Sequence, residues 1–126
     1  MAKRKVIEIP GLSHNAPIPL GAKIGSMVFS SGISGRNPET KVIPQEPDRQ
    51  AEMLFQNIRK FMELAGGTPE NIGHMTVFLK EEKYRESINK EWVKMFPDES
   101  DRPARHAVKA DLRGELLFQV ELIAVV

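Results

Sequence analysis

The sequence contains no cysteine. Disulfide bonds, a thiolate nucleophile and any metal site with cysteine ligands are therefore excluded. Histidine is also scarce: His14, His74 and His106 lie in three separate segments, without the H-x-x-x-H spacing of a zinc site. We therefore expect no bound metal.

The chain also lacks an excess of charge and a long apolar run. Its 18 Lys and Arg are balanced by 17 Asp and Glu, for a formal net charge of +1, so no overall field attracts it to nucleic acid or an anionic membrane. No apolar run approaches the roughly twenty residues that cross a bilayer, and the N-terminus lacks the apolar block of a secretory signal. We expect a soluble, cytoplasmic protein without a membrane partner, and nucleic acid is disfavoured as a partner.

Several familiar functional motifs are missing as well. There is no G-x-S-x-G nucleophile elbow, and the glycines of "SSGISG" (30–35) follow a strand and precede a turn rather than a helix. No aromatic platform lies on basic strands, as RNA-binding sheets require. Serine hydrolases, phosphate-loop proteins and the common RNA-binding modules are therefore disfavoured.

Apolar periodicity predicts two helices and five strands. The expected helices span 47–65 and 83–96, and the expected strands span 5–9, 26–34, 74–80, 104–111 and 115–125. We expect the last two strands to form a hairpin around Arg113-Gly114. At 126 residues the chain is expected to form one domain, residues 1–126. The order of elements predicts an α+β fold with both helices on one face of a mixed sheet.

Two helices cover only one face of such a sheet. The predicted strands nevertheless carry apolar residues on both faces, notably Phe78, Val108, Leu117, Phe118, Val120 and Ile123. The chain has no further element to cover the second face. We therefore expect a homo-oligomer that buries this face between subunits.

Arg105 is the most informative charged residue. It stands at the start of a strand that soon becomes apolar, in "DRPARHAVKA" (101–110). One interpretation is a surface arginine paired with Asp101 or Glu99. The other is a clamp for a carboxylate, because the planar guanidinium donates two parallel hydrogen bonds to such a group. His106 is expected to point to the opposite side of the strand.

Seven segments occur in the order and spacing of one known family. They are "NAPIPLG", "VFSSGIS", "QAEMLFQNIRKFMELAGGTPENI", "TVFLK", "INKEWVKMFP", "RPARHAV" and "QVELIAVV". The S-S-G after a strand, the P-A-R that opens the penultimate strand and the terminal E-x-I-A-V are specific in combination. Over nearly its whole length the chain resembles the RidA (YjgF-like) family.

The resemblance implies a chorismate-mutase-like α+β subunit and a barrel-shaped homotrimer with three clefts between subunits. It also implies cofactor-independent hydrolysis of reactive 2-imino and 2-enamino carboxylates to keto acids and ammonia. By the same resemblance Arg105 holds the substrate carboxylate, and the segment of Ser31 and Gly32 shapes the pocket floor. Asn89, the asparagine of the family's motif in the second helix, and Ala107 are also expected to bind the substrate.

The sequence departs from the family pattern at three places. The glutamate that usually presents water is Gln119 here, and an amide cannot accept a proton near neutral pH. The acid two residues further along the family's motif is present as Glu121. It would take over the role of the missing glutamate if its face of the strand meets Arg105. The cysteine found two residues after the arginine in many relatives is Ala107, and their cleft tyrosine is absent.

Three functions remain open at this point. The first is an imine deaminase with Arg105 as the clamp and Gln119 or Glu121 holding water. The second is a non-catalytic binder of a carboxylate metabolite or a protein on the same scaffold, which the missing glutamate favours. The third is a role on RNA, since relatives have been described as ribonucleases, and the balanced charge disfavours it.

Overall fold

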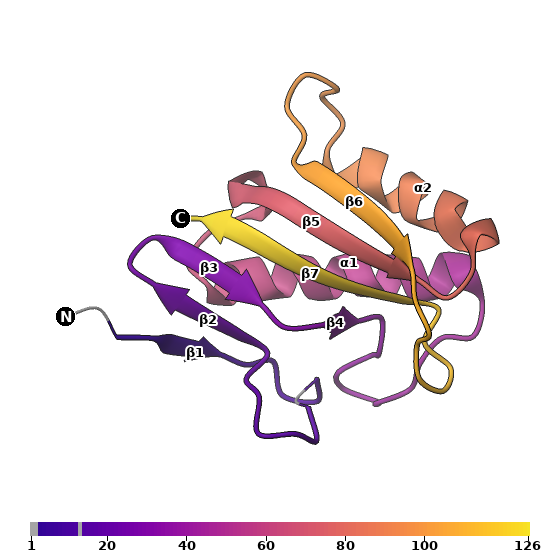
Figure 1. Ribbon diagram of the computed structural model, residues 1–126, viewed down its shortest axis with the longest axis horizontal. Coiled ribbons are helices and arrows are strands. Elements are labelled where there is room, and N and C mark those ends of the chain that lie inside the picture. The colour runs from indigo at the N-terminus through magenta and orange to yellow at the C-terminus, as the bar shows by residue number, and fades with distance from the viewer. Residues whose placement is uncertain (1–2, 13) are drawn as a thin grey trace.

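Seven strands form one mixed sheet in the computed structural model, which describes residues 3–12 and 14–126 (Figure 1). In chain order the strands are β1 (Lys5–Ile7), β2 (Gly21–Ile24), β3 (Met27–Ser30), β4 (Ile33–Ser34), β5 (Ile72–Leu79), β6 (Ala104–Lys109) and β7 (Phe118–Val125). Their spatial order is β1-β2-β3-β7-β5-β6, and β4 pairs with the start of β7. β5 and β6 run parallel, whereas the other pairs are antiparallel. The predicted mixed sheet is confirmed.

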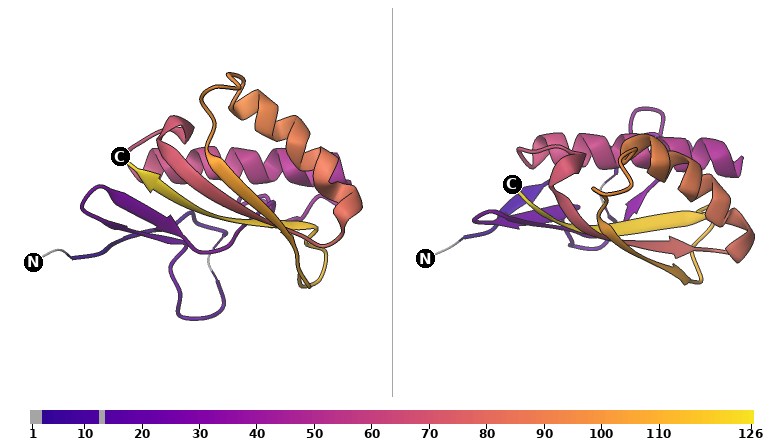
Figure 2. Two further views of the ribbon diagram at one scale, coloured as in Figure 1. Left: turned by 45° about the horizontal axis from the view of Figure 1, so that its top comes forward. Right: turned by 90° about the horizontal axis from the view of Figure 1, so that it is seen from above.

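Both predicted helices are present, and both lie on the same face of the sheet (Figure 2). Helix α1 (Pro47–Leu64) begins at a proline, whose missing N–H is not needed in the first turn, and ends before Gly66 at a φ of +91°. The second predicted helix is a 3₁₀ turn, η2 (Glu82–Tyr84), followed by α2 (Arg85–Met95). A further 3₁₀ turn, η1 (Pro69–Asn71), leads from α1 into β5.

The hydrophobic core lies between the helix layer and the sheet. The side chains buried there from the helices include Leu54, Ile58, Phe61, Met62, Ile88 and Trp92. From the sheet they include Met75, Val77, Leu79, Phe118, Val120 and Leu122. Phe118 and Val120 were predicted to be buried against a partner subunit. They belong instead to the core of the single chain.

The predicted hairpin between the last two strands is wrong. β5 lies between β6 and β7: Met75 pairs with Arg105 of β6 on one side and with Leu122 of β7 on the other. The reason is that β5, α2 and β6 form a β-α-β unit, whose crossover brings β6 back parallel to β5. The Arg113-Gly114 turn lies in the long connection from β6 to β7, where Gly114 has a φ of +57°.

The N-terminal part of the sheet also differs in detail from the prediction. The expected strand 26–34 is divided into β3 and β4, with the break at Ser31-Gly32. β2 lies within a segment that was predicted to be a connector. That prediction rested on Pro17 and Pro19, which come just before the strand. The result is an antiparallel meander of β1, β2 and β3 beside β7.

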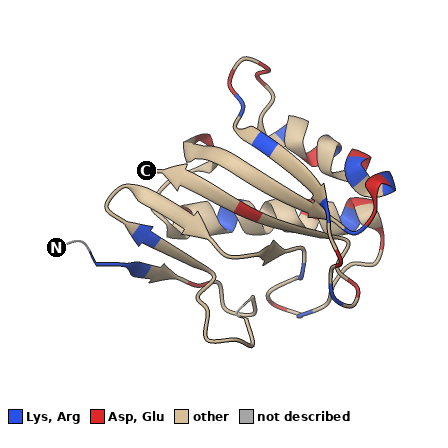
Figure 3. Cartoon of the chain, viewed as in Figure 1, with Lys and Arg blue, Asp and Glu red and all other residues tan. Residues whose placement is uncertain are grey.

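The sheet face away from the helices, called here the open face, is apolar and uncovered. Met27, Phe29, Ile123 and Val125 are between 36% and 51% exposed, and they are neighbours because Met27 pairs with Val125 and Phe29 with Ile123. Figure 3 shows that β3 and β5 carry no charged residue and that β7 carries one acid. An apolar area of this kind on a strand layer indicates a protein contact.

Candidate functional site

Arg105 lies on the face of the sheet that the helices cover, beside its buried β5 partner Met75. Asn89 and Trp92 are three residues apart on α2, so their side chains leave the helix on the same side. Arg105 Nη2 donates a hydrogen bond of 2.8 Å to Asn89 Oδ1. Arg105 Cζ lies 4.8 Å from the centroid of the Trp92 ring. Arg105, Asn89 and Trp92 are called the Arg105 cluster below.

The Arg105 guanidinium is half-buried and has no acid partner. Its Nη1 is buried without a hydrogen-bond partner, and no ion pair in the described part of the chain involves Arg105. Burial and, less strongly, the positive charge of Arg85 lower the pKa of Arg105. The surface ion pair with Asp101 or Glu99 is therefore not formed. A half-buried cation with a free N–H is a suitable partner for an anion.

The neighbours of Arg105 along β6 point to alternate faces. Ala107 lies on the same face as Arg105 and packs against the hydrophobic core. His106 is exposed on the open face, paired with Thr76, as strand alternation predicts. The position two residues after Arg105 on this face is thus occupied by a small apolar side chain.

Other residues predicted for the site gather at a second place, where several loops meet the start of β7. A pocket of about 460 Å³ there, called the loop pocket, is lined in part by His14, Gly32, Arg36, Arg113 and Gln119. Gly32 and Gln119 are in close contact, since a Cβ at Gly32 would come within 2.5 Å of Gln119 Nε2. Gly32 and Gln119, both predicted for the site, therefore lie next to each other in this pocket.

Ser31 supports the loop pocket without lining it. Its hydroxyl donates a hydrogen bond of 2.8 Å to the carbonyl of Pro19, and its backbone N–H donates one of 2.7 Å to the carbonyl of Leu20. Both bonds fix the segment that leads from the pocket wall into β2. Ser31 is thus a positioning residue in this structure.

Two buried amide side chains of α1 hold the surrounding loops. Asn57 is 2% exposed, and its Nδ2 donates hydrogen bonds of 2.8 Å to the carbonyls of Ser34 and Arg36. Gln50 is fully buried, and its Oε1 accepts a hydrogen bond of 2.7 Å from the backbone N–H of Leu117. The loops that line the pocket are therefore attached to the rigid helix layer.

Within one chain, the Arg105 cluster does not meet Gln119 or Glu121. Arg105 shares the helix-covered face with Leu122, whereas Gln119 and Glu121 project from the opposite face of β7. Glu121 is exposed and paired with Thr76 in the centre of the open face. A site that uses all three predicted residues therefore needs two copies of the chain.

Sequence reasoning missed several residues at both places. Trp92 was not predicted for the site, although its spacing from Asn89 is a signal that both side chains face the same partner. His14, Arg36 and Arg113 come from three loops far apart in the sequence. No local pattern brings such loops together, because their contacts depend on the tertiary structure.

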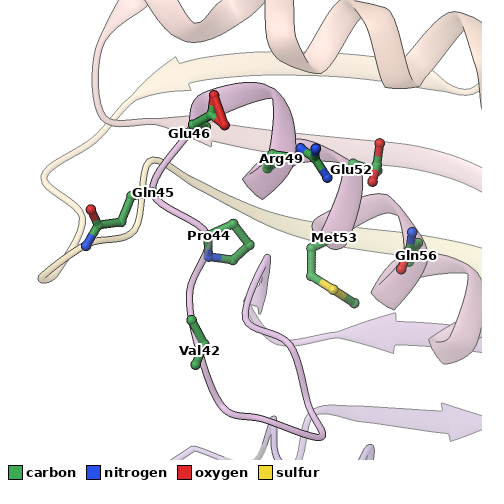
Figure 4. Close-up of a pocket in the computed structure, with 8 residues that line it drawn as sticks. All are labelled: Val42, Pro44, Gln45, Glu46, Arg49, Glu52, Met53 and Gln56. Atoms are coloured by element: carbon green, nitrogen blue, oxygen red, sulfur yellow. The ribbon is translucent and has the colours of Figure 1, made fainter.

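A separate groove of about 500 Å³ runs between the loop at Val42 and Pro44 and the first turns of α1 (Figure 4). Glu46, Arg49 and Glu52 line it, so it carries charges of both signs. It contains none of the residues that the sequence predicted for the site. We assign no function to it.

Among residues 3–12 and 14–126, no group of three or more His, Asp and Glu is arranged to hold a metal ion. No helix in these ranges has the length and apolar character needed to cross a bilayer.

Comparison with known proteins identifies the family. The family model described as Endoribonuclease L-PSP matches residues 16–126. A RutC family protein of Pasteurella multocida is 31% identical over 121 residues, which cover 90% of this chain and 94% of that protein. Among solved structures, Escherichia coli TdcF with bound serine is 30% identical with a TM-score of 0.87, covering 97% of this chain and 98% of that chain. RidA from the Antarctic bacterium Psychrobacter is 26% identical with a TM-score of 0.88, covering 97% and 99% of the two chains. The chain therefore belongs to the Endoribonuclease L-PSP family, which is the family of RidA and YjgF-like proteins.

Proposed function

We propose that this protein hydrolyses reactive 2-imino and 2-enamino carboxylates to 2-keto acids and ammonia, in clefts between the subunits of a cytoplasmic homotrimer. Membership of the RidA family supports the reaction class. TdcF, 30% identical to this chain, was solved with bound serine, a small amino acid that carries a carboxylate. A ligand of that class carries the carboxylate for which a guanidinium is the best-suited partner.

The Arg105 cluster is the observation that carries this proposal. Asn89 and Trp92 fix the guanidinium from one side, through a hydrogen bond of 2.8 Å and a ring contact of 4.8 Å. Arg105 Nη1 remains buried and without a partner. A substrate carboxylate at this position would receive a charge-assisted hydrogen bond in a partly desolvated setting, where such bonds are strongest.

The position of the cleft follows from the two faces of the sheet. Arg105 and Gln119 lie on opposite faces of one chain, so one cleft holds both only if they come from different subunits. The apolar open face supplies the contact that would bring a second copy close, because Phe29 and Ile123 are 39% and 40% exposed there. A closed ring of three copies would repeat this contact at each interface.

The reaction requires orientation, water and proton transfer. The water oxygen attacks C2 of the imine, the resulting carbinolamine loses its nitrogen as ammonia, and the C2–O bond becomes the carbonyl of the keto acid. Gln119 can hold the water but cannot take its proton near neutral pH. Glu121 lies two residues further on the same strand face, about 7 Å along the strand, and its carboxylate can accept that proton.

The proposal is tested by ammonia release from imino acids that an amino-acid oxidase generates in situ, with semicarbazide to trap the free imine. We expect wild type to accelerate release and Arg105→Ala to lose about 100-fold or more in kcat/KM, as for other truncated charge pairs. Arg59→Ala, at an exposed position of α1, is the matched control and should behave as wild type. Equal rates for wild type and Arg105→Ala would refute the clamp.

The second candidate is a carboxylate-binding protein without turnover. Gln119, in place of the family's glutamate, favours it because the amide removes the usual proton acceptor. Carboxylates would then raise the unfolding temperature of wild type but not of Arg105→Ala, while ammonia release stays at the uncatalysed rate. An activity on RNA, which the family description suggests, is disfavoured by the net charge of +1.

A further inference from the structure

Besides Gly32 and Gln119, the loop pocket is lined by positively charged side chains. Arg36 lines it from the loop after β4, and Arg113 lines it from the connection between β6 and β7. Asp111 also belongs to the lining and is exposed. None of the ion pairs in the described part of the chain involves Arg36, Arg113 or Asp111. Two cationic side chains and one carboxylate therefore border one cavity, and neither arginine forms an ion pair.

A third polar residue of the lining, His14, has a ring nitrogen without a hydrogen-bond partner. His14 Nε2 is buried and has no hydrogen-bond partner. A ring nitrogen of histidine donates a hydrogen bond when it carries the proton. Burying such a group costs free energy unless a partner is provided. Because His14 lines the loop pocket, a ligand that displaced the atoms covering Nε2 would provide this partner.

Arg36 is held in position by the fold. Its side chain is half-buried, its carbonyl accepts a hydrogen bond of 2.8 Å from Asn57 Nδ2, and its backbone N–H contacts Ser34 Oγ at 3.3 Å. Asn57 is itself 2% exposed. A cation on such a fixed backbone loses less conformational entropy on binding than one on a free loop.

Gln119 is consistent with the same preference for an anion. A glutamate at this position would add a negative charge to the pocket and repel an anionic ligand. The amide of Gln119 is neutral, and its NH₂ group can donate hydrogen bonds. It packs against Gly32, where a Cβ would come within 2.5 Å of Gln119 Nε2. Gln119 therefore weakens proton transfer at this site but favours the binding of an anion in the loop pocket.

We infer that the loop pocket binds a second anionic group, a carboxylate or a phosphate, of a ligand whose first carboxylate is held by Arg105 of a neighbouring subunit. The substrates would then be imino acids with an acidic side chain. This inference rests on the proposed function for the identity of the reaction. The binding of an anion between Arg36 and Arg113 depends only on the single chain.

The anion site is tested by calorimetric titration with inorganic phosphate, at constant ionic strength set with sodium chloride. We expect wild type to bind phosphate and both Arg36→Gln and Arg113→Gln to raise its Kd about tenfold or more. Arg59→Gln, on the exposed side of α1, is the control and should leave the Kd unchanged. Absence of binding to wild type, or a Kd in the two pocket variants equal to that of wild type, would overturn the inference.

Turnover then distinguishes this inference from the proposed function. Ammonia release is compared for 2-iminoglutarate, which has a second carboxylate, and 2-iminopentanoate, which has none. We expect wild type to prefer the diacid by about tenfold in kcat/KM and Arg113→Gln to bring this ratio close to one. Turnover without preference would overturn the inference and leave the deaminase standing. Arginine-dependent phosphate binding without any turnover would support the anion site and refute the deaminase.

Discussion

The Arg105 guanidinium lies over the indole ring of Trp92, with 4.8 Å between Cζ and the ring centroid. A cation–π contact of this kind stabilises the charged group by about 0.5–2 kcal/mol. Replacing Trp92 by Leu removes the ring, whereas Trp92→Phe keeps an aromatic face. We therefore predict that Trp92→Leu raises KM for a carboxylate substrate about 2- to 30-fold, and that Trp92→Phe raises it less.

The measurement is a comparison of KM in the two variants, with unfolding curves recorded in parallel because Trp92 is only 8% exposed and part of the core. Both substitutions leave unfilled volume and should lower stability. An equal KM in the Leu and Phe variants would show that the ring face does not support the guanidinium.

Gln119→Glu should restore a proton acceptor next to the bound water. General base catalysis by a positioned carboxylate contributes about 100-fold or more, so we predict an increase in kcat of at least about tenfold. The rate of the variant should fall below about pH 5, as the new carboxylate becomes protonated. The pH profile of ammonia release measures both effects. An unchanged rate with an unchanged profile would remove Gln119 from the reacting centre.

The open face should hold the subunits together. Phe29 and Ile123 are cross-strand partners, 39% and 40% exposed. A glutamate at position 29 would place an unpaired charge in the contact, so we predict that Phe29→Glu dissociates the protein into single chains of 14.2 kDa. Sedimentation measures the mass. Leu64→Glu, at a position 49% exposed at the end of α1, is the control and should keep the wild-type mass.

A wild-type mass equal to one chain would contradict the subunit cleft. So would a Phe29→Glu variant that sediments as wild type does.

Gln50 should be essential for the loops that reach the start of β7. Its side chain is fully buried: Nε2 donates to the carbonyls of Pro44 and Glu115, and Oε1 accepts from the N–H of Leu117. Gln50→Leu leaves these three backbone groups without their partner. We predict a loss of about 3 kcal/mol or more in the free energy of unfolding, measured with a chemical denaturant. Gln56→Leu, exposed on the same helix, should change it by less than about 0.5 kcal/mol.

A loss no larger in Gln50→Leu than in the Gln56 control would show that the loops hold without this amide.

Much of the fold could be predicted from local patterns. The four-residue spacing of Leu54, Ile58 and Met62 predicted one apolar face of α1, and all three are fully buried. Alternation predicted that Met75 and Val77 of β5 share one side of the strand, and the structure shows that this side faces the core. Such patterns depend on neighbours along the chain, and burial on one side imposes them directly.

The strand order and the assembly of the site could not be predicted in this way. The last two strands were predicted to be neighbours in the sheet, but β5 lies between them. Only the parallel pairing of Met75 with Arg105 shows which face of β6 the guanidinium occupies. The loop pocket was missed for the same reason, since His14, Arg36 and Arg113 meet only after folding.

Complementation between subunits tests the shared cleft most directly. Two variants are expected to be inactive alone: Arg105→Ala, and the double variant Gln119→Ala, Glu121→Ala. When the two chains are co-expressed and assemble at random, about a quarter of the clefts combine an intact Arg105 with an intact Gln119 and Glu121 from the neighbour. We predict that the mixed protein recovers about a quarter of wild-type ammonia release. Mixed oligomers as inactive as either variant alone would contradict a site built from two subunits.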